Sequence, residues 1–233
     1  ALQSYNELLH GFDSSNSDLD AVTQVSISDN AALDMGADVD FSLSLWFKTD
    51  EDYSVYTNLF RKGGWGAEGY SIGFQPSGYL AINTSTTGNN DWGYTTTAIE
   101  KGKWYHVVGV WDRSANQTLY LNGAEQTMVN GDISGNTGDL NNSSAIKIHD
   151  GNDGFTGCVT EIALFKNRAI GIGNVKQLYN DGKALDAMLC DDANYITGYW
   201  RNNGLSTWKD LSTNSNDGTV TGTETILIPA GVD

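Results

Sequence analysis

The chain has 233 residues, 39% of them hydrophobic, which is enough for the core of one large β domain. Its 27 glycines and its many Asn, Ser and Thr residues favour short strands joined by turns over long helices. A net charge of −16 disfavours nucleic acid and anionic membrane surfaces as partners, because they carry charge of the same sign. No apolar run reaches 18 residues, so no membrane insertion is predicted.

The first half of the chain contains several predicted strands. Residues 41–48 (FSLSLWFK) alternate between apolar and more polar side chains, which indicates a strand with one face in a core. The stretch RKGG at 61–64 is predicted to break the chain. Strands are then expected at 69–74 and 79–83, joined by the turn residues PSG at 76–78.

The next segments continue the β pattern. Residues 104–111 (WYHVVGVW) form a nearly continuous apolar run, which predicts a central strand buried on both faces. Residues 118–125 (TLYLNGAE) predict a hairpin, because Asn-Gly adopts the positive φ angles of a type I′ turn. Further strands are predicted at 145–148 and 158–165.

Helical periodicity is confined to residues 173–185, which predict one short helix near 173–182 with Gly182 as its stop. Strands at roughly ten-residue spacing with so little helix predict an all-β sandwich or barrel.

Four blocks in order resemble the laminin-G-like, concanavalin A-like (pentraxin-like) family. They are residues 41–48, 103–112 (KWYHVVGVWD), 119–123 (LYLNG) and 157–169 (GCVTEIALFKNRA). The resemblance implies a two-sheet antiparallel jelly-roll sandwich that is mostly non-catalytic and binds glycans or proteins, often with Ca²⁺. Such domains occur in secreted proteins and in bacteriophage virion proteins. Thr160 stands where the family has an Asp, which weakens any cation site that uses that carboxylate.

The C-terminal segment resembles the segment that normally opens such a domain, and a tail of this kind follows the domain in many marine bacteriophage proteins. We expect one domain, 1–233, with residues 193–233 completing the sandwich in cis as a circular permutation, or exchanged with a neighbouring subunit. Residues 195–220 are predicted to be β-structure, because their aromatic side chains alternate between two faces.

A Ca²⁺ site is predicted in HDGNDG at 149–154, where Asp150, Asn152 and Asp153 supply hard oxygen ligands. The resemblance puts the pentraxin-like calcium loop in the same place. The alternative is an ordinary turn rich in Asp and Asn. His149 is expected to be a turn or solvent-facing residue without a role.

Three more acidic residues are weaker metal candidates. The resemblance offers Glu68 as part of a second contributing loop. Asp18 and Asp20, in DSSNSDLD at 13–20, could hold a structural cation, although the Gly and the final Glu of an EF-hand are missing.

Trp65, Trp92 and Tyr94 lie among Gly and Asn residues in predicted loops. Exposed aromatic residues there are suited to stacking on sugars or to a protein contact. Alternatively, each folds back as a lid on the sandwich.

The sequence does not favour an enzyme. A glycosidase needs two carboxylates flanking one bond, and no Glu-x-Asp-x-Glu strand motif, Gly-x-Ser-x-Gly elbow or His-Glu-x-x-His motif is present. Cys158 and Cys190 either form a disulfide or remain as two buried thiols.

The predicted function is therefore a non-catalytic binding or structural module. We expect a bacteriophage virion surface protein, such as a capsid decoration, fibre or tail-associated protein, that binds a glycan or another surface protein and forms a homo-oligomer or contacts capsid or tail proteins. The first alternative is a secreted Ca²⁺-dependent lectin module, and the second is a glycoside hydrolase of this fold.

Overall fold

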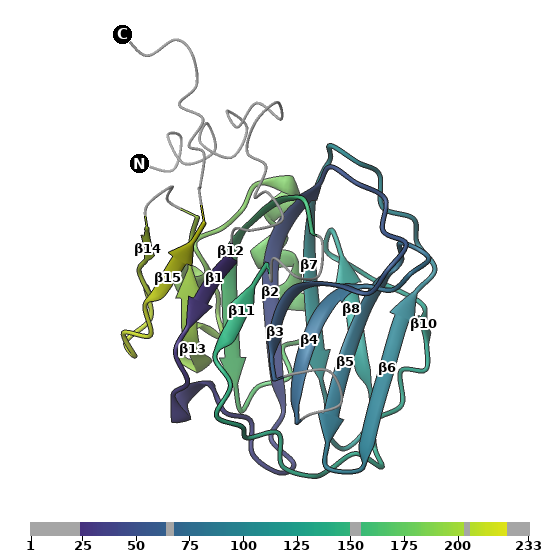
Figure 1. The fold of residues 1–233 in the computed structure, drawn as a ribbon, viewed down its shortest axis with the longest axis vertical. Helices are drawn as coiled ribbons and strands as arrows, with labels where there is room; N and C mark the ends of the chain where they lie inside the picture. Colours follow the sequence, from purple (N-terminus) through teal and green to yellow (C-terminus); the bar gives the residue numbers. More distant parts are fainter. Residues whose placement is uncertain (1–23, 64–67, 150–154, 203–205, 223–233) are drawn as a thin grey trace, which may run out of the picture.

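A computed structural model describes residues 24–63, 68–149, 155–202 and 206–222 as two antiparallel sheets packed face to face (Figure 1). The larger, nine-stranded sheet has the spatial order β10 (Met128–Val129), β6 (Asn89–Thr95), β5 (Leu80–Thr86), β4 (Gly69–Phe74), β3 (Thr57–Lys62), β11 (Ile146–Ile148), β1 (Gln24–Ile27), β15 (Gly218–Thr221), β14 (Thr207–Trp208). The six-stranded sheet has the order β13 (Ile196–Trp200), β12 (Gly157–Lys166), β2 (Phe41–Thr49), β7 (Trp104–Trp111), β8 (Gln117–Leu121), β9 (Ala124–Glu125). The predicted two-sheet sandwich is confirmed.

The helical segments are short. They are η1 (Ala31–Leu33), α2 (Ile172–Tyr179), η2 (Asn180–Gly182), η3 (Ala187–Leu189) and η4 (Ala193–Tyr195). The α-helix ends earlier than the predicted stop, because Asn180 adopts the left-handed conformation at φ 46° and ψ 51°. Gly182 ends the short η2 turn instead.

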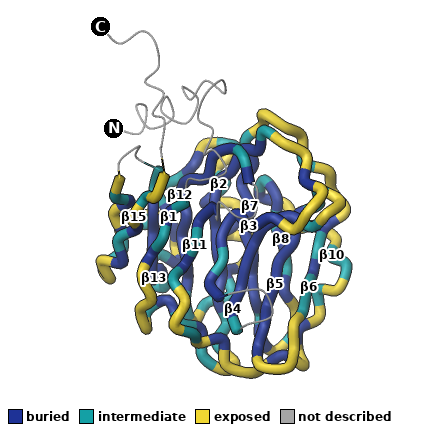
Figure 2. Tube along the Cα trace, in the orientation of Figure 1, coloured by how far each residue is buried: buried dark blue, intermediate teal, exposed yellow. Residues whose placement is uncertain are grey.

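Strand β2 shows how the alternating sequence builds the core. Its apolar side chains at 41, 43, 45 and 47 point between the sheets and are fully buried. It pairs in continuous register with β7, from Phe41 opposite Trp111 to Lys48 opposite Trp104. Figure 2 shows the resulting band of buried residues along the inner strands and the exposed loops around it.

The predicted hairpin is also present, since Asn122 and Gly123 both have positive φ angles, of 49° and 78°. The predicted chain break at 61–64 begins later than expected. Arg61 and Lys62 belong to β3, and Gly63, at φ 91°, starts the turn.

Lys62 remains in the strand because its buried ammonium is neutralised. Its Nζ lies 2.6 Å from Asp29 Oδ1 and 3.1 Å from Asp34 Oδ1. It also donates hydrogen bonds to the carbonyl oxygens of Asn142 and Ser144. A buried charge is tolerated when it is paired and hydrogen-bonded in this way.

The C-terminal segment contributes strands to both sheets of its own chain. Strand β13 pairs with β12, and β15 pairs with β1. Trp200 and Trp208 are fully buried in the core between the sheets. Gly198 is required beside Trp200, because a Cβ there would lie 2.1 Å from the indole ring.

Residues 210–217 (DLSTNSND) form a hydrogen-bonded loop centred on Asp210. Its carboxylate accepts hydrogen bonds from the backbone N–H groups of Tyr199, Ser212 and Asn216 at 2.8–3.0 Å. The Asn216 carbonyl in turn accepts a 2.8 Å hydrogen bond from Trp200 Nε1. The loop 210–217 is therefore hydrogen-bonded to β13 through Asp210 and Asn216.

Replacement of Trp208 by Ala should lower the free energy of unfolding by about 3–5 kcal/mol, the usual cost of emptying a buried aromatic position. Urea denaturation measures the change. Leu211→Ala serves as the control, since this neighbouring side chain is 43% exposed and should change stability by less than about 0.5 kcal/mol. Truncation after Asp192 should give insoluble or strongly destabilised protein. Equal stability of the two point variants would indicate that the segment is only an accessory.

Candidate functional site

The two outer faces of the sandwich differ in what covers them. On the six-stranded sheet, outward residues such as Val108 and Phe165 form one apolar cluster with Val175 and Leu178 of α2 and Ala187 of η3. That face is closed by the helical segments. In front of β3 to β6, by contrast, Figure 1 shows no helix within the described part of the chain.

The front of β3 to β6 carries polar and aromatic side chains, as the strand register shows, although Ser71 and Asn83 are only 7% and 8% exposed. Trp92 lies opposite Asn83, Asn83 opposite Ser71, and Ser71 opposite Arg61. Tyr94 lies two residues after Trp92 and therefore on the same side of β6. We call Arg61, Ser71, Asn83, Trp92 and Tyr94 the front-face cluster.

Two of the three aromatic residues predicted for the binding site, Trp92 and Tyr94, therefore lie on the same face. Trp92 and Tyr94 lie in β6, so their predicted placement in a loop is wrong. Both are half-buried. The ring of Tyr56, which is 45% exposed, packs against Trp92 with 5.3 Å between ring centroids. Trp65 lies outside the described residues.

Asn83 and Arg61 give this aromatic surface hydrogen-bonding groups. Asn83 Nδ2 donates to Asn90 Oδ1 at 2.6 Å and to the Asp91 carbonyl at 3.3 Å, which orients the side-chain amide and leaves its oxygen as the group for a ligand. Arg61 Nη1 donates to the Gly63 carbonyl at 3.0 Å. Sequence reasoning did not predict Arg61 or Asn83 as site residues, because only the pairing of strands places them beside Trp92.

Of the predicted metal ligands, only Glu68 lies within the described residues. Asp18, Asp20, Asp150, Asn152 and Asp153 lie outside the described residues, so the Ca²⁺ site stays a prediction. Glu68 accepts a hydrogen bond from the Thr87 hydroxyl, which lowers the pKa of its carboxyl group. Within the described ranges, no three His, Cys, Asp or Glu side chains form a group that could hold a metal ion.

His149 and the cysteines are buried. His149 is fully enclosed and its Nε2 contacts the Phe155 carbonyl, so its predicted solvent-facing position is wrong. Its φ of 53° does place it at a sharp bend after β11. Cys158 and Cys190 form no disulfide, which favours the alternative of two buried thiols.

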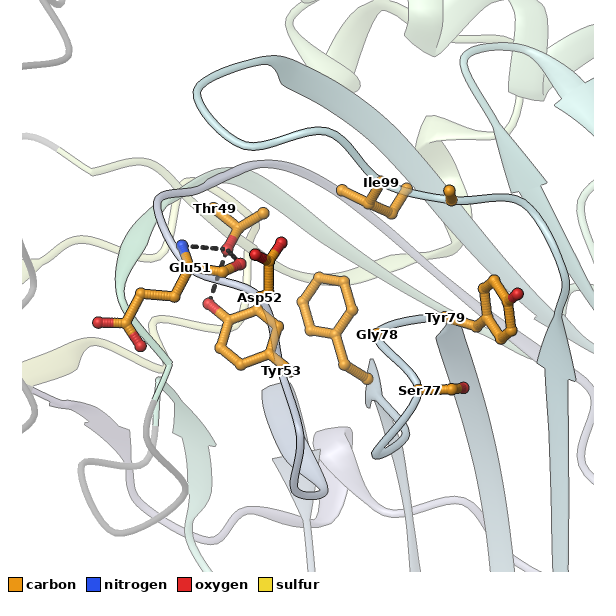
Figure 3. Close-up of a pocket in the computed structure, with 10 residues that line it drawn as sticks. Thr49, Glu51, Asp52, Tyr53, Ser77, Gly78, Tyr79 and Ile99 are labelled. Atoms are coloured by element: carbon orange, nitrogen blue, oxygen red, sulfur yellow. Dashed lines mark hydrogen bonds between the residues drawn. The ribbon is translucent and has the colours of Figure 1, made fainter.

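A pocket of about 260 Å³ opens at the rim of the sandwich between the loop after β2 and the β4–β5 turn (Figure 3). Tyr53 forms its inner wall and hydrogen-bonds Thr49 Oγ1 at 2.8 Å and the Thr156 carbonyl at 3.1 Å. Burial raises the pKa of Tyr53 to about 12. Figure 3 shows the Glu51 carboxylate pointing away from Tyr79 and Ile99. The carboxylates of Glu51 and Asp52 therefore do not face each other across the pocket.

A buried acidic group lies in β12 of the six-stranded sheet. A bulge in β12 gives Glu161 a φ of 53°, and its side chain is 5% exposed. Its carboxylate accepts a hydrogen bond from the Tyr199 hydroxyl and lies 2.9 Å from Arg201 Nε. Burial raises the pKa of Glu161 to about 7, against the opposing effect of Arg201.

The comparison with protein families identifies this architecture. Residues 19–170, well over half of the chain, match the model of the concanavalin A-like lectin/glucanases superfamily, a laminin-G-like family. The chain belongs to this superfamily. The resemblance of the four sequence blocks is therefore confirmed. A comparison with curated proteins finds no match.

Solved structures with the same concanavalin A-like fold are distant in sequence. A putative carbohydrate-binding protein from Bacteroides ovatus is 18% identical, with a TM-score of 0.57 over 86% of this chain and 58% of its own. The binding domain of Paraclostridial Mosquitocidal Protein 1 is 17% identical, with a TM-score of 0.56 over 68% and 41%. Domain 4 of the arabinanase AbnA from Geobacillus stearothermophilus, solved with arabinotriose, is 19% identical, with a TM-score of 0.52 over 70% and 75%.

The chain thus spans about half the length of the first two of these proteins. By their descriptions they are mainly binding domains, although the arabinanase domain belongs to a glycoside hydrolase. In the described part of this concanavalin A-like domain, no helix is long and apolar enough to cross a membrane.

The raised pKa of Glu161 predicts a pH-dependent stability. The folded state keeps a proton that the unfolded state loses near pH 4.5, so this contribution is present below that pH and is lost as the pH rises through about 7. Over that window the free energy of unfolding of the wild type should fall relative to Glu161→Gln, by at most about 1.4 kcal/mol per pH unit. Urea denaturation of both proteins between pH 4.5 and 8 measures it. Parallel pH profiles would contradict the assignment.

Proposed function

We propose that this concanavalin A-like domain binds carbohydrate on the outer face of β3 to β6. The observation that carries the proposal is the front-face cluster. Trp92 and Tyr94, both half-buried, lie beside the amide of Asn83 and the guanidinium of Arg61, on the face that no helical segment of the described residues covers. Sugars present apolar C–H faces and hydroxyl edges, so they need aromatic contact and hydrogen bonds together.

The relatives support this choice of ligand class. One structure of the same fold is described as a putative carbohydrate-binding protein, and another was solved with arabinotriose. Their identity to this chain is below 20%, so they support the class of ligand and not a particular sugar.

The rim pocket is a weaker candidate for the same ligand. Its inner polar groups, Thr49 and Tyr53, already hydrogen-bond each other. Asp52 forms an exposed ion pair with Lys101 at 2.6 Å. The front-face cluster places a Trp and a Tyr beside a guanidinium and an amide, so we place the sugar there.

We further propose that binding is not followed by cleavage. The front-face cluster contains no carboxylate, whereas glycoside hydrolysis needs a pair on either side of the bond. Glu161 has a pKa in the range of a proton donor, but it is buried beneath the helical side and paired with Arg201.

The biological setting remains a prediction. A role on a bacteriophage virion surface, and the alternative of a secreted lectin module, rest on the sequence resemblance. Mass spectrometry of purified virions from the source of the chain distinguishes them. Assembly with copies of itself or with capsid or tail proteins, and Ca²⁺ binding near Asp150, are likewise predictions.

Trp92→Ala and Tyr94→Ala should each lower the affinity for a bound polysaccharide by about two- to tenfold, because each removes an aromatic contact worth roughly 0.5–1.5 kcal/mol. Affinity electrophoresis against a panel of soluble neutral and acidic polysaccharides, followed by calorimetry on those retained, measures the loss.

Tyr79→Ala is the matched control, because Tyr79 lines the rim pocket. It should bind as the wild type does. If Tyr79→Ala abolishes binding while Trp92→Ala and Tyr94→Ala retain it, the sugar occupies the rim pocket and the proposed face is wrong. If no polysaccharide is retained by the wild type, the carbohydrate-binding function itself is rejected.

A further inference from the structure

The rim pocket lies at one end of the core, between segments that belong to different sheets (Figure 3). The loop after β2 of the six-stranded sheet forms one side, and the β4–β5 turn of the nine-stranded sheet forms another. Residues 98–99, which precede β7, complete the wall. Every residue that lines the pocket belongs to the described ranges, and none of them is a member of the front-face cluster. The pocket is therefore built from a different set of residues than the proposed carbohydrate site.

The bottom of the pocket is apolar. Tyr53 and Phe74 close it, since their rings stack with 4.6 Å between centroids and both residues belong to the core. They are only 7% and 2% exposed, so they offer a ligand little surface. The open walls come from Ile99 and Tyr79, both half-buried, and from the exposed Ala98. A ligand in the pocket therefore contacts mainly these three side chains.

The polar groups inside the pocket already hydrogen-bond one another. The Tyr53 hydroxyl contacts Thr49 Oγ1 at 2.8 Å and donates to the Thr156 carbonyl at 3.1 Å. The backbone N–H of Glu51 donates to Thr49 Oγ1 at 3.2 Å. A sugar hydroxyl would lose its water here and find no free partner among these groups, which costs binding free energy. An apolar group suits the bottom of the pocket better.

The mouth of the pocket carries an excess of negative charge. The carboxylates of Glu51 and Asp52 are accompanied by one ammonium group, that of Lys101, which lies 2.6 Å from Asp52 Oδ2. The side chains of this ion pair are 51% and 77% exposed, so the pair is weak and a second cation can share the carboxylate. The net charge of −16 adds to the attraction for a cation and repels an anion.

The size of the pocket limits the ligand. Its volume of about 260 Å³ lies just below the range of roughly 300–1,000 Å³ that is usual for drug-sized ligands. It therefore suits one ring and not an oligosaccharide.

We infer that the rim pocket binds a small amine that carries an aromatic ring, with the ring against Ile99 and Tyr79 and the ammonium group at Asp52. Asp52 is the assigned carboxylate because that of Glu51 points away from Ile99 (Figure 3). This site goes beyond the proposed carbohydrate-binding function and does not depend on it.

NMR titration of the full chain with isotope-labelled isoleucine methyl groups tests the inference, and Ile99→Val assigns the Ile99 signal. The probes are phenethylamine, which is a cation at neutral pH, neutral phenethyl alcohol, anionic phenylacetate and ethylamine, which lacks the ring. Phenethylamine should shift the Ile99 signal and bind about threefold tighter than phenethyl alcohol, because it adds an exposed ionic contact. Phenylacetate should bind more weakly than both, and ethylamine should leave the signal unshifted.

The test variant is Asp52→Asn, and Asp181→Asn is its control. Asp181 is exposed in η2, so this variant makes the same change of charge away from the pocket. Asp52→Asn should lower the phenethylamine affinity about two- to fivefold and leave the phenethyl alcohol affinity unchanged. Asp181→Asn should change neither. Melting temperatures equal to that of the wild type verify that both variants fold.

Two aromatic variants separate the rim pocket from the front-face cluster. Tyr79→Ala should lower the phenethylamine affinity about two- to tenfold and keep polysaccharide binding, since Tyr79 lines only the pocket. Trp92→Ala should do the reverse.

Four results would overturn the inference. They are an unshifted Ile99 signal with phenethylamine, equally tight binding of phenethyl alcohol or phenylacetate, equal effects of the two aspartate variants, and loss of phenethylamine binding in Trp92→Ala. None of them decides whether the domain binds carbohydrate, because retention of polysaccharides by the wild type is measured separately. Failure of either site is therefore distinguishable from failure of the other.

Discussion

The pairing of β12 with β13 is the interaction on which the rest of the sandwich depends. β12 lies between β2 and β13, and the chain then crosses to the other sheet, where β15 pairs with β1. Without the C-terminal segment, β12 and β1 would both become open edges, and the space now filled by Trp200 and Trp208 would be exposed to water. One segment therefore closes both sheets and completes the core between them.

The same region of the chain also makes the two outer faces different. Residues 172–195 pass over the six-stranded sheet as α2 and three short helical turns, and their apolar side chains form a second cluster with that sheet. Tyr199 of β13 belongs to this cluster and also hydrogen-bonds Glu161 of β12. The helical segments therefore cover one outer face, while no helix of the described residues covers the front of the nine-stranded sheet.

Elements with strong local patterns were predictable from the sequence. The alternation in 41–48 and the Asn122-Gly123 turn act within a few residues, so the chain itself specifies them. Strand β6 (NNDWGYT) was not predictable, because its Asn, Asp and Gly residues favour turns and only pairing with β5 and β10 holds it extended. The strand position of Lys62 likewise depends on Asp29 and on carbonyl groups about 80 residues away.

The site was predictable only for its aromatic residues, because Asn83 and Arg61 come to lie on the same face as Trp92 only through the register of β3 to β6. The net charge of the chain does not predict this local arrangement, because it is a sum over the whole sequence. The charge of −16 still opposes a densely charged polymer such as DNA, which meets many carboxylates at once. A sugar on the front face would meet only the few side chains that the register of β3 to β6 brings together, so register and not overall composition decides what that surface offers a ligand.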